Sequence, residues 1–336
     1  KQFWSKFQST CSDSSFCGDT MGSSISGAGA QAPKSRQPPP LDLQRAEAWP
    51  QLPLASEVQS AAAALAERSS SVVRVLTWNV WFDPFFGPRR QHALMQELLG
   101  AAPDIACLQE VLPVFAEVLR ESAALRKVYD ISPQDVAPYG CLMLVRRDLR
   151  PQFGSRGLPS EMDRELLFAD CTARCPSLLV ATVHLESLNF AAVRKQQLQV
   201  IADTLKSHPL SIICGDFNFD DTQTWGDWRL KKPRFGPDEL ENHVLRDVLP
   251  AYCDTWRTVH PSKPGKTFDG EVNPICVPDR LERMRYDRLL ASTRVGLKPI
   301  AADLLGTMDI DCDIAGLKPS DHFGVLVDLL VENMSS

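Results

Sequence analysis

The sequence lacks any apolar run approaching the roughly 18 residues that a helix needs to cross a bilayer. It also lacks an apolar segment near its first residue, so we expect no secretory signal. Positive charge is not in excess either, because the net charge is −6 and the pI is near 5.6. These values exclude a broadly basic nucleic-acid coat but leave room for a local basic groove. With 44% hydrophobic and 23% charged residues, the composition predicts a soluble globular protein.

The spacing of a zinc site is absent as well, although the chain has ten cysteines. The one close pair, Cys171 and Cys175, has no second pair and no nearby histidine to complete a tetrahedral site. Cys107, Cys141 and Cys214 fall in apparent strands. We therefore expect buried free thiols in a reducing compartment rather than disulfides.

Residues 1–70 are rich in Ser, Gly, Ala, Gln and Pro. Such a segment cannot bury enough apolar surface to offset its ordering entropy, so we predict a disordered low-complexity tail. Within it, the Ala-rich stretch from Glu57 to Arg68 can form a short helix. The residues from Met21 and Gly22 onward fit the N-myristoylation pattern if translation starts at Met21, and a plain flexible tail is the alternative.

Residues 71–332 show a different pattern, in which apolar strands are separated by amphipathic helices. Some consecutive strands have no helix between them, so we expect a mixed sheet and a single α/β sandwich domain. The segment 220–280 is irregular and rich in Trp, Pro and Lys. The predicted strands are 72–79, 104–110, 128–131, 141–146, 166–171, 178–184, 210–216, 285–292 and 324–330.

Polar clusters fall at the ends of five of these strands, where sites on open α/β sheets form. They are Thr77-Trp78-Asn79, Leu108-Gln109-Glu110, Val183-His184-Leu185-Glu186, Gly215-Asp216-Phe217-Asn218 and Ser320-Asp321-His322. The candidate site residues among them are three carboxylates (Glu110, Asp216 and Asp321), two amides (Asn79 and Asn218) and two imidazoles (His184 and His322). Clustered carboxylates repel unless a cation lies between them, and oxygen ligands without thiolates suit Mg²⁺ or Mn²⁺ rather than zinc. Hydrolysis of a phosphate ester is the chemistry that this combination predicts.

With Arg285-Tyr286-Asp287-Arg288, these motifs resemble in content and order those of the endonuclease/exonuclease/phosphatase superfamily. The resemblance covers 71–332 and implies a four-layer α/β/β/α sandwich of two mixed β-sheets flanked by helices. Within the superfamily, the sequence is most similar to the Mg²⁺-dependent phosphodiesterases that release a tyrosine left on a 5′ DNA phosphate by a trapped topoisomerase. The resemblance therefore implies that the protein is a metal-dependent phosphoric diester hydrolase that acts in DNA repair.

The resemblance also implies roles for individual residues. Glu110, Asn79 and Asp321 would hold Mg²⁺, with Mn²⁺ as a substitute. Asp216 would orient or deprotonate the attacking water, and Asn218 would steady a phosphate oxygen. The remaining catalytic residues would be His322, held by Asp287, and His184, with Asn79 assisting.

Three of these residues also have a structural interpretation. Glu110 can complement the dipole of a helix that starts at Pro113. His184 can be a hydrogen-bonded core histidine. Asp287 can pair with Arg285 or Arg288 instead of with a histidine.

Candidate substrate contacts follow the strand that ends at Asp216. Aromatic residues beside cations suit single-stranded nucleic acid, and a solvated loop is the alternative. The candidates are Trp225, Trp228, Lys231, Lys232 and, by resemblance, Phe268. The resemblance also implies a DNA partner, single-stranded or at 5′ ends, a monomer, and a nuclear or cytoplasmic location.

Two departures from the resembling phosphodiesterases concern charge. Those proteins carry an Arg where this chain has Asp220 and another where it has Leu188-Asn189. Because these two positive charges are missing, other activities remain compatible with the sequence. They are those of an abasic-site endonuclease, an RNA deadenylase, and an inositol-lipid or sphingomyelin phosphatase. A non-catalytic scaffold that binds nucleic acid or protein is a further alternative.

Overall fold

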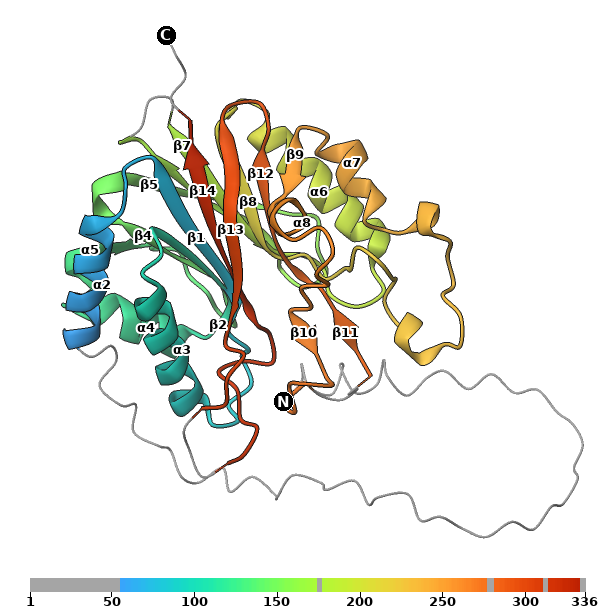
Figure 1. Ribbon diagram of the computed structural model, residues 1–336, viewed down its shortest axis with the longest axis horizontal. Coiled ribbons are helices and arrows are strands. Elements are labelled where there is room, and N and C mark those ends of the chain that lie inside the picture. Colours follow the sequence, from blue (N-terminus) through green and yellow to red (C-terminus); the bar gives the residue numbers. More distant parts are fainter. Residues whose placement is uncertain (1–54, 174–176, 277–280, 311–313, 333–336) are drawn as a thin grey trace, which may run out of the picture. The chain divides into compact units, whose positions relative to one another are not determined.

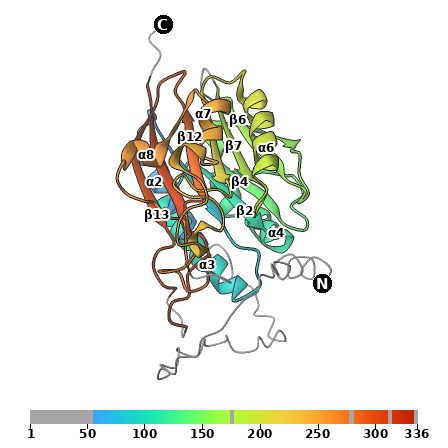
Figure 2. The same cartoon turned by 90° about the vertical axis from the view of Figure 1, so that its right-hand side faces the viewer.

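The computed structural model describes residues 55–173, 177–276, 281–310 and 314–332, all within one compact unit, 46–336. Two six-stranded β-sheets face each other, and helices cover their outer faces (Figures 1 and 2). The four-layer α/β/β/α sandwich is therefore confirmed. No helix in the described ranges is both long enough and apolar enough to span a membrane.

The first sheet has the strand order β13-β14-β1-β2-β4-β3. Only β1 and β2 are parallel in it, and the other pairs are antiparallel. Its strands are β1 Val72–Asn79, β2 Ile105–Val111, β3 Tyr129–Ile131, β4 Gly140–Arg146, β13 Leu297–Leu305 and β14 Gly324–Val331.

The second sheet has the order β5-β6-β7-β8-β12-β9, with β7 and β8 as its parallel pair. A separate two-stranded sheet joins β10 Phe268–Asp269 to β11 Arg283–Met284. The strands of the second sheet are β5 Pro151–Gly157, β6 Glu165–Cys171, β7 Leu178–His184, β8 Ser211–Asp216, β9 Tyr252–Asp254 and β12 Asp287–Ser292.

Helices bury the outer faces of both sheets. On the first sheet, Leu94 and Leu98 of α3 and Phe115 of α4 share one core cluster with Trp78. On the second, Leu198 and other residues of α6 pack over β7 and β8. The helices are α2 Ala55–Glu67, α3 Gly87–Ala101, α4 Pro113–Glu121, α5 Leu125–Val128, α6 Ala191–Leu205, α7 His243–Val248 and α8 Thr255–Val259, with 3-10 turns η1 Arg147–Leu149, η2 Asp227–Arg229 and η3 Pro237–Glu239.

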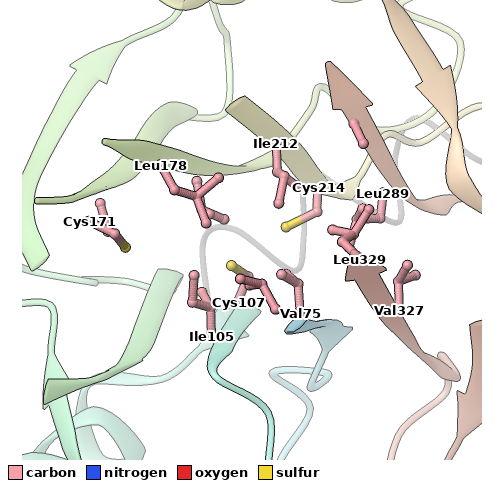
Figure 3. Close-up of a cluster of buried hydrophobic side chains, with 14 of the residues drawn as sticks. Val75, Ile105, Cys107, Cys171, Leu178, Ile212, Cys214, Leu289, Val327 and Leu329 are labelled. Atoms are coloured by element: carbon pink, nitrogen blue, oxygen red, sulfur yellow. The ribbon is translucent and has the colours of Figure 1, made fainter. Parts of the chain in front are cut away.

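A second apolar layer fills the space between the sheets. Side chains alternate along each strand, so every second residue of β1, β2, β7 and β8 points into this layer. Cys107 and Cys214 point toward each other there from opposite sheets (Figure 3). Neither thiol forms a disulfide, and the same holds for the other four cysteines in the described ranges, which agrees with the expectation from the sequence.

The predicted tail overlaps one ordered element. Helix α2 spans Ala55–Glu67 and buries Val58, Ala61 and Leu65 in the same cluster as α3. A disordered tail reaching residue 70 is therefore wrong for this part, because an Ala-rich helix with three apolar residues on one face finds a partner. Residues 1–54, with the pattern at Met21, lie outside the described residues.

The sequence analysis missed the short strands β9, β10 and β11, and it also missed β5 and β13, each of which departs from a strand pattern. Strand β5 contains Gly154 and Gly157 and has no buried residue. Strand β13 contains Pro299, at which the pairing with β14 shifts register. Both lie at a sheet edge, where such residues are tolerated.

Candidate functional site

The polar clusters predicted from the sequence meet at one end of the two sheets. Strands β1 and β2 of the first sheet end there, as do β7 and β8 of the second. Asn79 and Asp216 join the two sheets directly, since Asn79 Nδ2 lies 3.0 Å from Asp216 Oδ2. The topology explains this meeting, because the ends of two parallel pairs from facing sheets converge over the shared core.

Asp216 is buried and accepts hydrogen bonds from two sides. Its Oδ2 faces Asn79, and its Oδ1 accepts from the backbone N–H of Asn218 at 2.9 Å. Burial raises the pKa of Asp216 to about 6, with His322 opposing this and Asp287 adding to it. The carboxylate is therefore ionised at neutral pH but close to its protonated form.

Asn218 does not continue the strand, so its side chain is not placed by strand alternation. Strand β8 ends at Asp216, and Asn218 has a left-handed φ of 56°. Its Nδ2 donates to the carbonyl of Leu185 at 3.0 Å. That bond ties the loop after β8 to the loop after β7.

Gly215 is the residue that lets β8 approach β7 at the site. Its φ is 134°, and a Cβ there would lie 1.9 Å from the carbonyl oxygen of Val183. We expect Gly215→Ala to destabilise the fold by at least about 2 kcal/mol, because both strain and overlap with backbone must be relieved. Thermal unfolding measures this effect. Gly157→Ala is the control, since a Cβ there meets nothing within 4 Å, and an equal loss in both variants would contradict the expectation.

Glu110 is turned toward the site by a β-bulge. By strand alternation along β2, the side chain of Glu110 would point to the same face as that of Leu108, which faces the helices. A register shift between Leu108 and Val111 and a left-handed φ of 59° at Glu110 change this direction. Glu110 Oε1 lies 3.9 Å from His184 Nε2, and its Oε2 accepts from the backbone N–H of Phe82 at 3.1 Å.

His322 lies between two carboxylates. Its Nδ1 is 2.7 Å from Asp287 Oδ2, and its Nε2 is 3.9 Å from Asp216 Oδ2. Burial alone would lower the pKa of His322, but the charge and hydrogen bond of Asp287 and the charges of Asp321 and Asp216 hold it well above its usual value. His322 is therefore an imidazolium at neutral pH. Arg285 and Arg288 do not form the alternative ion pair with Asp287; Arg285 pairs with Asp221 and Asp254.

The segment that carries Asp321 and His322 is fixed to β1. Trp78 Nε1 donates to the carbonyl of His322 at 2.9 Å, and Ser320 Oγ donates to the carbonyl of Asn79 at 2.7 Å. Burial raises the pKa of Asp321 to about 7, a shift that Glu110 increases and that His322 and Arg90 oppose.

His184 faces an arginine that the sequence analysis did not single out. Arg164 is buried and its Nη2 lies 3.3 Å from His184 Nε2 and 3.1 Å from Ser187 Oγ. A guanidinium can only donate, so we assign the His184 proton to Nδ1. Burial and the charges of Arg164 and His322 lower the pKa of His184 well below its usual value. His184 is therefore neutral.

Arg164 also lines a pocket of about 220 Å³ next to His184. Its guanidinium carbon lies 5.6 Å from the centre of the Tyr139 ring, which forms another wall. The guanidinium Nε is buried without a hydrogen-bond partner. Arg164 lies in the loop that precedes β6 and belongs to no motif, so only the fold reveals it.

Two sets of side chains could hold a metal ion. Asp216, Asp287 and His322 offer ligand atoms that lie within 4.8 Å of one another. In that set, however, His322 is a cation whose Nδ1 is already bonded to Asp287. Glu110 and Asp321 form the second set, in which burial and then repulsion by the Glu110 carboxylate raise the pKa of Asp321. A hard divalent cation would remove this repulsion, so the second set fits Mg²⁺ better. Asn79 Oδ1 already accepts from the N–H of Trp81 at 3.0 Å, which leaves it one lone pair.

The predicted substrate residues divide into three kinds. Phe268 is buried, with its ring centre 5.1 Å from that of His322. Trp225 and Trp228 are half-buried against a small cluster that includes Phe268 and Tyr286. Lys231 and Lys232 are exposed.

The structure also shows what occupies the two positions where an arginine was expected. Asn189 is exposed. Asp220 is buried, and its carboxylate accepts from Lys266 Nζ at 2.8 Å and from the N–H of Arg285 at 2.6 Å. Asp220 therefore holds the loop after β8 in place, and this position does not offer the site the positive charge that an arginine would bring.

Residues 76–322 match the model of the Endonuclease/Exonuclease/phosphatase family, and the chain belongs to that family. Family membership makes it a hydrolase of phosphate esters. Tyrosyl-DNA phosphodiesterase 2 of Danio rerio is 26% identical over 275 residues, which cover 78% of this chain and 68% of the relative. The same enzyme of Mus musculus is 28% identical over 273 residues, which cover 78% and 67%.

Solved structures agree with the fold. The crystal structure of D. rerio TDP2 complexed with single strand DNA product superposes with a TM-score of 0.62 and 24% identity, covering 77% of this chain and 99% of that one. At this identity the likeness establishes the fold, and the site must be argued from the residues present.

Proposed function

We propose that this protein is a Mg²⁺-dependent phosphodiesterase that hydrolyses a phosphate ester at DNA ends and resembles tyrosyl-DNA phosphodiesterase 2. The observation that carries the proposal is the meeting of Asp216, His322, His184 and Glu110 at one end of the facing sheets. The relatives named above support the choice of substrate, a 5′-tyrosyl DNA end. Nuclear action, in the repair of trapped topoisomerase adducts, follows from the same relatives.

Each residue has a task that its surroundings support. Asp216 accepts a proton from the attacking water, because it is ionised at neutral pH and fixed by Asn79 and Asn218. Protonated His322 donates to a phosphate oxygen, and Asp287 orients its ring. Such preorganised donors act where charge develops in the transition state. Neutral His184 accepts from Arg164 through Nε2, so it donates to the phosphate or the leaving oxygen through its Nδ1–H.

Glu110 and Asp321 would hold Mg²⁺ or Mn²⁺, with Asn79 beside them. The ion would supply positive charge to the phosphate oxygens and orient the ester for in-line attack. The test is direct: isothermal titration with Mg²⁺ should give a binding isotherm that is lost in Glu110→Gln.

The pocket beside His184 suits the leaving group. Its volume of about 220 Å³ is below the roughly 300 Å³ at which sites for drug-sized ligands begin, so it has room for one side chain. Tyr139 offers an aromatic face there, and Arg164 offers a guanidinium that pairs well with phosphate oxygens. An aromatic phosphate ester therefore fits this pocket better than an aliphatic one.

A substrate comparison tests the proposed function. The purified protein is incubated with Mg²⁺ and equal concentrations of a 5′-tyrosyl single strand, an abasic duplex, polyadenylate, a phosphoinositide and sphingomyelin. We expect release of tyrosine from the first substrate to have the highest kcat/KM, with Glu110→Gln inactive. A preference for another substrate would refute the tyrosyl assignment, and turnover of none would favour a non-catalytic scaffold.

Arg164→Gln should affect substrate binding more than the chemical step. Loss of a charge-assisted contact to phosphate costs about 1.5 to 3 kcal/mol, so KM for the 5′-tyrosyl strand should rise at least tenfold. Steady-state kinetics measures this change. Arg156→Gln is the matched control, since Arg156 is exposed on β5. An unchanged KM in Arg164→Gln would contradict the assignment of the pocket.

A further inference from the structure

The segment 225–239, called the basic arm here, carries at its centre, in residues 229–234, a concentration of positive charge in an acidic protein. Four of the six residues from 229 to 234 are Arg or Lys, whereas the whole chain has a net charge of −6. All residues from Arg229 to Glu239 are exposed. Lys231 and Lys232 form no ion pair with any residue that the structure describes. In Figure 1 the basic arm is the yellow-to-orange segment that extends away from the two sheets before α7.

The basic arm begins one layer of side chains away from His322. Rings of Phe268 and Tyr286 lie 5.1 Å and 6.2 Å from the His322 ring. Trp225 and Trp228 pack on the cluster that contains these two rings. An extended ligand that leaves the site past Phe268 therefore reaches the basic arm next.

Contacts within the basic arm leave its lysines facing solvent. Asp227 pairs with Arg234 at 3.2 Å and accepts a hydrogen bond from the backbone N–H of Thr224. The carboxylate near the start of the basic arm is therefore not available to pair with the lysines. Glu239 closes the far end by accepting from the N–H of Gly236 at 3.1 Å. Phe235, beside the lysines, has a side chain that is 47% exposed. An exposed aromatic ring among cations is the combination that binds single strands by stacking and phosphate pairing.

We propose that the basic arm binds the single strand that follows the scissile end, several nucleotides from the reacting phosphate. This inference rests on the proposed function, since it takes the substrate to be a DNA strand. Lys231 and Lys232 pair with phosphates, and Phe235 stacks on a base. Trp225 and Trp228 anchor the basic arm to the cluster beside His322. The basic arm thus supplies, farther along the chain, positive charge that Asp220 and Asn189 do not provide.

The test compares a long and a short substrate. The long one is a 5′-tyrosyl single strand of about 16 nucleotides, the upper site size for strand-binding modules. The short one is the p-nitrophenyl ester of thymidine 5′-monophosphate. In Lys231→Glu/Lys232→Glu we expect the ratio of kcat/KM for the long to the short substrate to fall about tenfold. The slope of log KM against log salt for the long strand should fall by about 1.4, because two phosphate contacts are lost.

Lys127→Glu/Lys298→Glu is the matched control. These exposed lysines lie at the opposite end of the first sheet, because β3 and β13 begin where β4 and β14 end. An equal drop in the control would assign the effect to net charge and overturn the proposal. Phe235→Ala should also lower the ratio, by about fivefold or more. An unchanged ratio in both variants of the basic arm would overturn it as well.

A direct binding measurement separates this proposal from the proposed function. If the wild-type protein cleaves neither substrate, the proposed function fails. Fluorescence anisotropy with the same strand lacking tyrosine then decides about the basic arm. Binding weakened about tenfold by Lys231→Glu/Lys232→Glu supports strand binding, and equal binding refutes it.

Discussion

Asp216→Asn should lower kcat for the 5′-tyrosyl strand by about 10³ with little change in KM. The substitution keeps the size of the side chain but removes the negative charge that accepts the proton of water. Asn79 Nδ2 and the N–H of Asn218 each donate to one oxygen of the wild-type carboxylate. In Asp216→Asn the new NH₂ group faces one of these donors and cannot accept from it, which displaces the amide. Loss of a single preorganised catalytic group typically costs about 10² to 10³ in rate, and the misplaced amide adds to this.

Single-turnover kinetics with saturating enzyme measures the effect on the chemical step. Circular dichroism should show an unchanged fold, so the loss of activity does not come from unfolding. Asp203→Asn is the control, since Asp203 is exposed on α6 and undergoes the same chemical change. A loss below about tenfold in Asp216→Asn would exclude Asp216 as the group that handles water.

The pH dependence of the wild-type protein should reflect the same carboxylate. The pKa of Asp216 is raised to about 6, so the ionised form that accepts a proton is lost as pH falls through that value. His322 stays protonated across this range, because its pKa lies well above its usual value. At saturating Mg²⁺, which would keep Asp321 ionised, activity should therefore decline below about pH 6, and Asp216→Asn should lack this decline.

His322→Gln should lower kcat by about 10² to 10³, because the imidazolium that donates to the phosphate is lost. Asp287→Asn should cost less, since His322 keeps its place but its pKa falls when the carboxylate at 2.7 Å is removed. Asp287 acts through His322, so the double variant should be no slower than His322→Gln alone.

This double-mutant cycle distinguishes a positioning role from an independent one. Multiplicative losses in the double variant would show that Asp287 contributes in another way, for instance as a metal ligand in the set with Asp216. The pH profile gives a second readout, because Asp287→Asn should bring the loss of His322 protonation into the measurable alkaline range.

Much of the fold follows from local patterns in the sequence. Strand β1 spans the predicted residues 72–79, and apolar runs likewise mark β2, β7 and β8. Polar residues end these strands, and parallel pairing brings their ends together. Asn79, Asp216 and His184 could therefore be grouped before the fold was known, and His322 joins them because β14 starts beside the end of β1.

Other features depend on contacts between distant segments, which no local pattern encodes. The direction of Glu110 comes from a bulge against β4, and alternation along β2 predicts the opposite face. Arg164 reaches His184 from a loop twenty residues away, without a motif around it. The Ala-rich α2 becomes part of the core because α3 covers its apolar face. In each case tertiary packing overrides or completes the local signal.

The central claim is that water, handled by Asp216, attacks phosphorus and releases tyrosine from a 5′ DNA phosphate. Hydrolysis of the 5′-tyrosyl strand in ¹⁸O-labelled water with Mg²⁺, followed by mass spectrometry of both products, tests it most directly. The account predicts a single ¹⁸O atom in the new 5′-phosphate and unlabelled free tyrosine. A product phosphate without the label, or no release of tyrosine, would contradict it.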